Sequence, residues 1–124
     1  MTLGGFLGVM AVPIPFVEVG IAVSVVVLGA IVAIGVRAPL AIAIGAVGLF
    51  AIFHGHAHGS EMPLDVSGLE YGVGFMLATA MLHAVGIGIG FLIGVSSKTF
   101  GNNVYRIAGG LAATAGIALL LGYL

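Results

Sequence analysis

The stretch IAVSVVVLGAIVAIGV, residues 21–36, contains no charged side chain and no alternation of polar with apolar residues. A strand of a transmembrane β-barrel would alternate lumen-facing polar with lipid-facing apolar residues. A helix that spans a bilayer needs about 20 apolar residues. The stretch therefore predicts a transmembrane helix and, with it, an all-α protein.

The rest of the chain has the same character. Its 124 residues are 61% hydrophobic and 6% charged, whereas an ordinary soluble domain carries about 25% charged residues. Glycine, with 22 residues, suits membrane helices, whose backbones approach closely through small residues. The sequence predicts an integral membrane protein in a lipid bilayer. Its net charge of −1 gives no basic patch for nucleic acid, so we expect no nucleic-acid partner.

Charged residues and prolines divide the chain into five apolar segments. Pro13 and Pro15 end the first segment, because proline cannot donate the helical hydrogen bond and restricts its predecessor. We expect one integral membrane domain, residues 1–124, built as a polytopic transmembrane helix bundle with four to five membrane helices. Their expected ranges are 1–13, 17–36, 38–57, 69–95 and 104–124.

The few charges orient this bundle. Arg37 lies between the second and third segments, while Lys98 and Arg106 flank the turn between the fourth and fifth. Alternating helices place these cations on one side, which the positive-inside rule makes the cytoplasmic side. The carboxylates are expected together on the outer side, and they are Glu18, Glu61, Asp65 and Glu70.

Three of the four histidines lie in FHGHAHGSEMP, residues 53–63, near this acidic side. If the helix continues through the motif, His54, His58 and Glu61 share one face. If the chain is extended, His54, His56 and His58 share a face instead. Either geometry can gather three ligands around one cation. Metal binding is favoured over an interfacial loop, because polar groups in a membrane are costly without a function.

The ligand types limit the metal without choosing it. The chain has no cysteine, so a metal site must consist of nitrogen and oxygen. Imidazole suits nickel, cobalt, zinc and copper alike, and the affinity order alone favours copper.

Two further residues are candidate ligands. His83 stands alone near the middle of the fourth segment, where polar residues face the bundle interior and often mark an ion path. The alternative is a structural histidine bonded to a neighbouring helix. Glu18 begins a helix, where the dipole stabilises its carboxylate, and its place on the outer side makes it either a cap or a ligand.

Glycines four residues apart predict helix-packing faces. Gly55 and Gly59 bracket the histidines, and a second series in the fourth segment comprises Gly86, Gly90 and Gly94.

Three stretches together resemble the HupE/UreJ family of hydrogenase and urease accessory membrane proteins: PFVEVGIAVSVVVLGA (15–30), FHGHAHGSEMP (53–63) and YGVGFMLATAMLHAVGIGIG (71–90). The resemblance runs in order over nearly the whole chain. It implies a helical permease of the bacterial inner membrane that carries Ni²⁺, or Co²⁺, for hydrogenase or urease maturation. It places six residues on matching motif positions: Glu18, His54, His56, His58, Glu61 and His83.

The sequence departs from the family in one respect. The family usually has an earlier helix with a motif of the form H-P-x-x-G-x-D-H, which is not found in this chain. We therefore expect that an N-terminal portion is lost. The chain would then associate with that segment, with another subunit, or with copies of itself.

We expect transport rather than catalysis, with the metal as cargo and no resident cofactor. The chain has no G-x-x-x-x-G-K-[ST] loop for ATP and no G-x-S-x-G nucleophile. Two alternatives remain open. One is a metal-binding accessory subunit that does not transport, and the less favoured one is a membrane metalloenzyme that uses an H-x-x-x-H pair.

Overall fold

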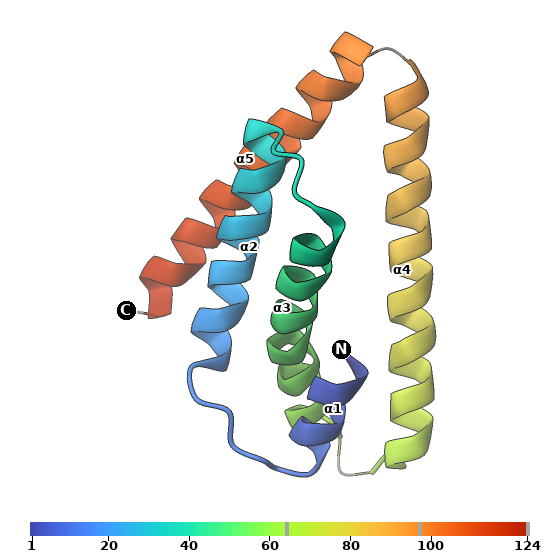
Figure 1. Cartoon of the computed structure of the whole chain (residues 1–124). Coiled ribbons are helices and arrows are strands. Elements are labelled where there is room, and N and C mark those ends of the chain that lie inside the picture. Colours follow the sequence, from blue (N-terminus) through green and yellow to red (C-terminus); the bar gives the residue numbers. More distant parts are fainter. Residues whose placement is uncertain (64, 97, 124) are drawn as a thin grey trace. The chain divides into compact units, whose positions relative to one another are not determined.

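The computed structural model describes residues 1–63, 65–96 and 98–123, and all regular structure within them is helical (Figure 1). The expected all-α class is therefore confirmed. The helices are α1 (Thr2–Val9), α2 (Val17–Ile34), α3 (Leu40–Ser60), α4 (Gly68–Ser96) and α5 (Lys98–Tyr123).

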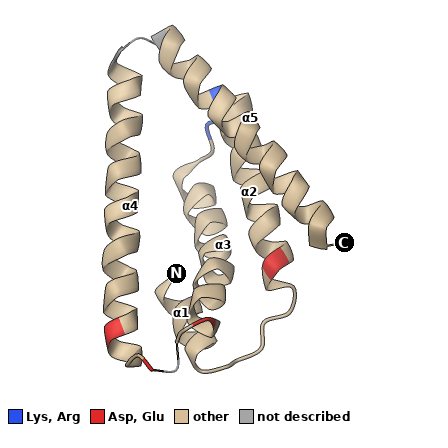
Figure 2. Cartoon of the chain, turned by 180° about the vertical axis from the view of Figure 1, so that it is seen from behind, with Lys and Arg blue, Asp and Glu red and all other residues tan. Residues whose placement is uncertain are grey.

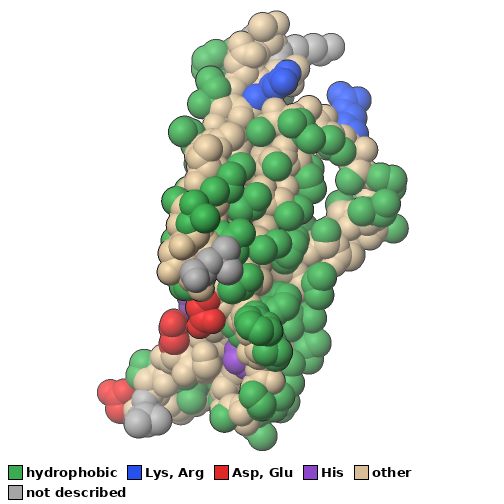
Figure 3. All heavy atoms as spheres, turned by 90° about the vertical axis from the view of Figure 1, so that its left-hand side faces the viewer, with side chains coloured by type: hydrophobic (Ala, Val, Ile, Leu, Met, Phe, Trp, Pro, Cys, Tyr) green, Lys and Arg blue, Asp and Glu red, His purple; other side chains and the backbone are tan. Residues whose placement is uncertain are grey.

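Four of these helices are long and apolar enough to cross a membrane, and they are Val17–Ile34, Leu40–Ser60, Gly68–Val95 and Thr99–Tyr123. The chain is a multi-pass membrane protein. With 8 residues, α1 is about 12 Å long and cannot cross a hydrocarbon core of about 30 Å. Figure 3 shows apolar side chains along the helices, as lipid contact requires.

Helix α1 ends at Val9 rather than near residue 13, because the chain turns in a Schellman motif. The amide of Val12 donates to the carbonyl of Leu7 at 3.0 Å, and that of Ala11 donates to Gly8 at 2.9 Å. Ala11 takes the left-handed position of this motif, with φ of 53°. A glycine usually occupies that position, so the sequence gives no warning of the turn.

Helix α2 also ends in a Schellman motif, and here a glycine occupies the left-handed position. The amide of Val36 donates to Ile31 at 3.1 Å, the amide of Gly35 donates to Val32 at 3.2 Å, and Gly35 has φ of 71°. The two motifs differ chiefly in which residue bears the left-handed conformation.

Two other helices are longer than expected. Helix α3 continues through the histidine motif to Ser60 instead of ending at 57, and α5 begins at Lys98 instead of 104. Glu61 follows α3, and its amide donates to Ala57 at 3.2 Å.

The first of two compact units comprises residues 1–21, 38–76 and 123, and within it α1 packs along the second half of α3. The contact is made by glycines on both helices. A Cβ at Gly4 or Gly8 would overlap the backbone of α3, and a Cβ at Gly55 or Gly59 would overlap the backbone of α1. The expected packing role of Gly55 and Gly59 is thus confirmed.

The second unit comprises residues 22–37 and 77–122, and in it α2 packs on α5. Gly29 of α2 faces Gly109 and Ala113 of α5 at backbone distance. The Nε of Arg106 donates to the carbonyl of Ala33 at 3.0 Å, near the end of α2. Small residues therefore bring these two helices into close contact.

The predicted glycine series of α4 packs only in part. Gly94 lies against Tyr105 of α5, whose hydroxyl donates to the carbonyl of Gly90. A Cβ at Gly86 or Gly90 would meet no described atom within 4 Å. The prediction that Gly86 and Gly90 let helices approach closely is therefore not confirmed within the described part of the chain, because a small-residue pattern does not determine which neighbour is present.

Acidic and basic residues lie at opposite ends of α2 (Figure 2). Glu18 is in the first turn of α2, and Arg37 follows its last turn. Glu70 is in the first turn of α4, and Lys98 follows that helix as the first residue of α5. The expectation that the Arg37 end of α2 faces the cytoplasm stays a prediction.

The two Schellman motifs predict opposite responses to exchanging alanine and glycine. Ala11→Gly should raise the free energy of unfolding by about 1 kcal/mol, because glycine adopts positive φ without the clash of a Cβ. Gly35→Ala should lower it by about 1–2 kcal/mol through φ alone, since a Cβ there meets no atom within 4 Å. Denaturant titration of both variants in detergent, followed by circular dichroism, measures the two shifts. Equal stability of both variants would contradict the assignment.

Candidate metal site

Three of the predicted ligands lie on the last turns of α3. Because the helix continues to Ser60, residues two apart are turned by about 200° around its axis. His54 and His58 therefore share a face, and His56 points away from them. This is the helical alternative of the two geometries considered for the motif.

His56 is buried beneath α1 and the loop that follows it. Its side chain is 8% exposed, and its Nε2 lies 2.7 Å from the carbonyl oxygen of Val12. A carbonyl oxygen can only accept, so Nε2 carries the proton and donates. In the neutral ring Nδ1 then holds a lone pair. That atom is buried, and it has no hydrogen-bond partner among the described residues.

An arrangement of this kind is common in histidines that bind metals. A ligating ring usually donates its other N–H to a carboxylate or a backbone carbonyl, which fixes the tautomer and orients the ring. A buried polar atom without a partner otherwise costs about 1–3 kcal/mol. The Nδ1 of His56 therefore fits a cation ligand.

His54 is oriented by its own helix. Its Nδ1 lies 3.2 Å from the carbonyl of Phe50, one turn earlier. Donation from Nδ1 leaves Nε2 as the ring atom with a lone pair. The side chain is half-buried.

His58 is exposed and contacts the start of α4. Its ring centroid lies 5.1 Å from that of Phe75, with the two planes tilted by 46°. The hydroxyl of Tyr71 donates to the backbone carbonyl of His58 at 2.8 Å. These contacts fix the end of α3 against the first turns of α4.

Glu61 and Glu18 are exposed residues of the same unit. Glu61 is the residue that caps the C-terminal end of α3, and Glu18 is in the first turn of α2. The carboxylate of Glu18 has the favourable helix-dipole position expected for it.

His83 belongs to the second unit, where α4 carries it, and its side chain is exposed instead of facing the interior as expected. Its Nδ1 lies 2.7 Å from the carbonyl of Thr79, one turn earlier on the same helix. This leaves Nε2 with a lone pair, as in His54. A structural bond from the ring to its own helix is therefore present, and the ring still keeps one nitrogen for a ligand.

The described part of the chain contains no group of three His, Asp or Glu residues placed to hold one metal ion. The helical motif explains this, because it turns the histidines to different sides of α3. The six predicted ligands are not gathered into one closed site, and their metal-binding role stays a prediction.

Sequence reasoning missed the groups that orient the histidines. The carbonyl of Val12 has no side-chain signature, and its role depends on how α1 ends. Tyr71 and Phe75 carry a weak signal, since aromatic residues four apart share a helix face.

Comparison with known proteins places the chain in a family. Residues 1–119 match the family described as HupE / UreJ protein. The chain is 43% identical over 122 residues to Protein HupE of Rhizobium leguminosarum bv. viciae, an alignment that covers 98% of this chain and 62% of that protein. This chain thus spans less than two thirds of the length of that relative. No solved structure matches it. With the matched residues covering nearly its whole length, the chain belongs to the HupE/UreJ family.

Proposed function

We propose that this chain carries Ni²⁺, or Co²⁺, across the bacterial inner membrane for the maturation of hydrogenase or urease. The observation that carries the proposal is the His56 ring, whose Nε2 is held by the Val12 carbonyl and whose buried Nδ1 has no partner among the described residues. Four apolar helices and membership of a family associated with nickel accessory functions support it.

The proposed path begins among carboxylates. Glu18, Glu61, Asp65 and Glu70 all belong to the first unit, whose described residues include no Lys or Arg. Carboxylates without neutralising side-chain cations raise the local concentration of a divalent ion. His54 and His56, which face different sides of α3, would then bind the ion one after the other, each through the ring nitrogen that does not donate.

His83 is the proposed ligand deeper in the membrane. At a rise of 1.5 Å per residue it lies about 20 Å along α4 from Glu70, which is near the middle of a hydrocarbon core of about 30 Å. Conduction requires several weak sites rather than one tight site, because a tightly held ion does not leave. Histidines that each bind the ion through a single ring nitrogen would provide such weak sites.

The absence of three convergent ligands in the described residues favours one alternative. Water or side chains from another subunit would have to complete the coordination shell. The second candidate is therefore a metal-binding accessory subunit that delivers the ion to a partner. Proteoliposomes containing only this chain distinguish the two, because an accessory subunit would bind ⁶³Ni without transporting it.

His56→Gln tests the first ligand. Glutamine can still donate to the Val12 carbonyl, but it replaces the imidazole lone pair with an amide oxygen, a poorer nickel ligand. We expect ⁶³Ni uptake by cells to fall by at least about tenfold, with the amount of inserted protein unchanged. Ser60→Ala is the matched control on the same helix, since its hydroxyl bonds only within the last turn. Uptake equal to that of the unaltered chain would refute the role of His56.

His83→Ala tests the deeper ligand separately from ion capture. We expect uptake to fall by at least about tenfold, whereas equilibrium binding of ⁶³Ni to the outer histidines should persist. Thr79→Ala is the control, because the carbonyl that orients His83 is a backbone atom and stays in place. If His83→Ala abolished binding and uptake together, or affected neither, the two-stage path would be wrong.

A further inference from the structure

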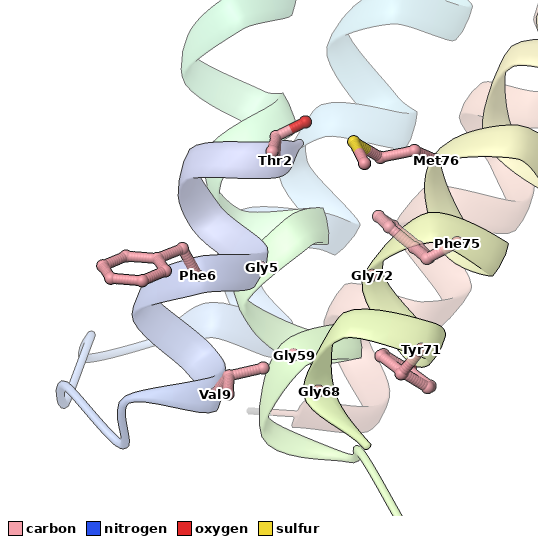
Figure 4. A pocket seen from close by; sticks show the side chains of 10 residues that line it. All are labelled: Thr2, Gly5, Phe6, Val9, Gly59, Gly68, Tyr71, Gly72, Phe75 and Met76. Carbon is pink, nitrogen blue, oxygen red and sulfur yellow. The ribbon is translucent and has the colours of Figure 1, made fainter. Parts of the chain in front are cut away.

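The second unit differs from the first in its charge. Residues 22–37 and 77–122 include Arg37, Lys98 and Arg106 but no Asp or Glu. An arginine of this unit therefore has no carboxylate partner within it. The first unit contains a cavity of about 320 Å³ whose lining has no charged side chain (Figure 4), so that cavity does not select a ligand by charge. The basic residues of the second unit do attract anions.

The packing of α2 on α5 determines which of these residues are near each other. The two helices run antiparallel, because Gly116 lies against Val26 and Gly109 lies against Ala33. Arg106 precedes Gly109 by three residues, which is nearly one turn. It therefore lies at the level where α2 ends.

Arg37 lies at the same level. The Nε of Arg106 donates to the carbonyl of Ala33 at 3.0 Å, and Arg37 follows Ala33 by four residues. Four residues span at most about 14 Å even when fully extended, and the Schellman turn at Gly35 shortens this distance. Basic residues accordingly appear both where α2 ends and on α5 (Figure 2).

The Arg106 guanidinium is oriented for a further acceptor. A guanidinium has five N–H donors in a plane, and the bond to Ala33 is made by Nε. The two terminal amino groups form the fork that binds phosphate bidentately. The side chains of Arg37 and Arg106 are both exposed. A Cβ at Gly35 would meet no atom within 4 Å, so the space beside the turn is open.

The length of α2 places both arginines at the depth of lipid headgroups. Its 18 residues are about 27 Å long, close to the thickness of a hydrocarbon core of about 30 Å. The 26 residues of α5 are about 39 Å long, so its first turns extend past the end of α2. Asn102 and Asn103 in these turns are exposed. The anions present at this depth are phospholipid phosphates.

We propose that Arg37 and Arg106 bind the phosphate of an anionic phospholipid where α2 ends. Arg106 donates to the phosphate through its terminal amino groups, and Arg37 supplies a second positive charge. An anionic headgroup is preferred over a zwitterionic one, because this unit has no carboxylate to pair with an ammonium group. The inference does not depend on nickel transport, since no histidine takes part in it.

The experiment measures binding of phosphatidylglycerol and of phosphatidylethanolamine with identical acyl chains to the unaltered chain in detergent, by native mass spectrometry. We expect phosphatidylglycerol to bind at least about fivefold more tightly. Equal binding of the two lipids, or tighter binding of phosphatidylethanolamine, overturns the headgroup assignment. An excess of inorganic phosphate should leave phosphatidylglycerol bound. Its displacement would identify a free anion as the ligand and overturn the lipid assignment.

Arg37→Gln and Arg106→Gln test the location of the site. Each should weaken phosphatidylglycerol binding about fivefold, and the two together about thirtyfold, because each removes one positive charge from the headgroup level. Thr114→Ala is the control on α5, since its hydroxyl donates to Leu111 of the same helix at 2.9 Å. Unchanged phosphatidylglycerol binding by a folded double variant overturns the location.

The glutamine variants change charges that orient membrane helices. If they fail to insert, Arg106→Lys replaces them, because lysine keeps the charge but lacks the planar fork. We expect this variant to weaken phosphatidylglycerol binding at least about twofold through the lost hydrogen bond. Binding equal to that of the unaltered chain would overturn the role of Arg106. The comparison of the two lipids uses the unaltered chain and stands in either case.

Discussion

The close approach of α1 to α3 is the interaction on which the histidine region depends. In a bilayer there is little hydrophobic force between helices, so association relies on packing and hydrogen bonds. Gly4 and Gly8 on one helix and Gly55 and Gly59 on the other let the two backbones touch. The loop after α1 is thereby brought over α3, where the Val12 carbonyl reaches the ring of His56.

The sequence HGHAHG encodes this arrangement through its alternation. On a helix, Gly55 and Gly59 form one stripe and His54 and His58 a second stripe about 100° away. His56 lies on the other side of the glycine stripe, again by about 100°. The glycines that accept α1 are therefore flanked by histidines on both sides. The loop after α1 covers only one side, where the Val12 carbonyl meets the ring of His56, and His58 on the other side remains exposed.

Hydropathy and charge were sufficient to predict the class of the fold and the long helices, because lipid contact leaves a strong compositional signal. The spacing of Gly55 and Gly59 predicted a real contact. The ends of α1 and α3 were not predictable in the same way. Ala11 adopts a conformation that usually requires glycine, and the polar residues before Ser60 resemble a loop although they remain helical.

In the candidate site, the identity of the histidines could be predicted from the sequence, but their orientation could not. Residue types identified the histidines, since polar groups are rare in such a chain. Their orientation depends on backbone carbonyls of Phe50, Val12 and Thr79, and a backbone carbonyl is present at every residue. No pattern of side chains can therefore show which one will accept. Whether the predicted ligands converge on one ion likewise depends on how the helices pack and cannot be read from the pattern of side chains.

His58 connects the histidine region to α4. Its carbonyl accepts from Tyr71 and its ring lies against Phe75. His56, two residues earlier, is held instead by the Val12 carbonyl after α1. Because the two histidines face different sides of α3, each is positioned by a different neighbouring segment. The orientation of these histidines therefore depends on the packing of α3 between its neighbours and not on the motif alone.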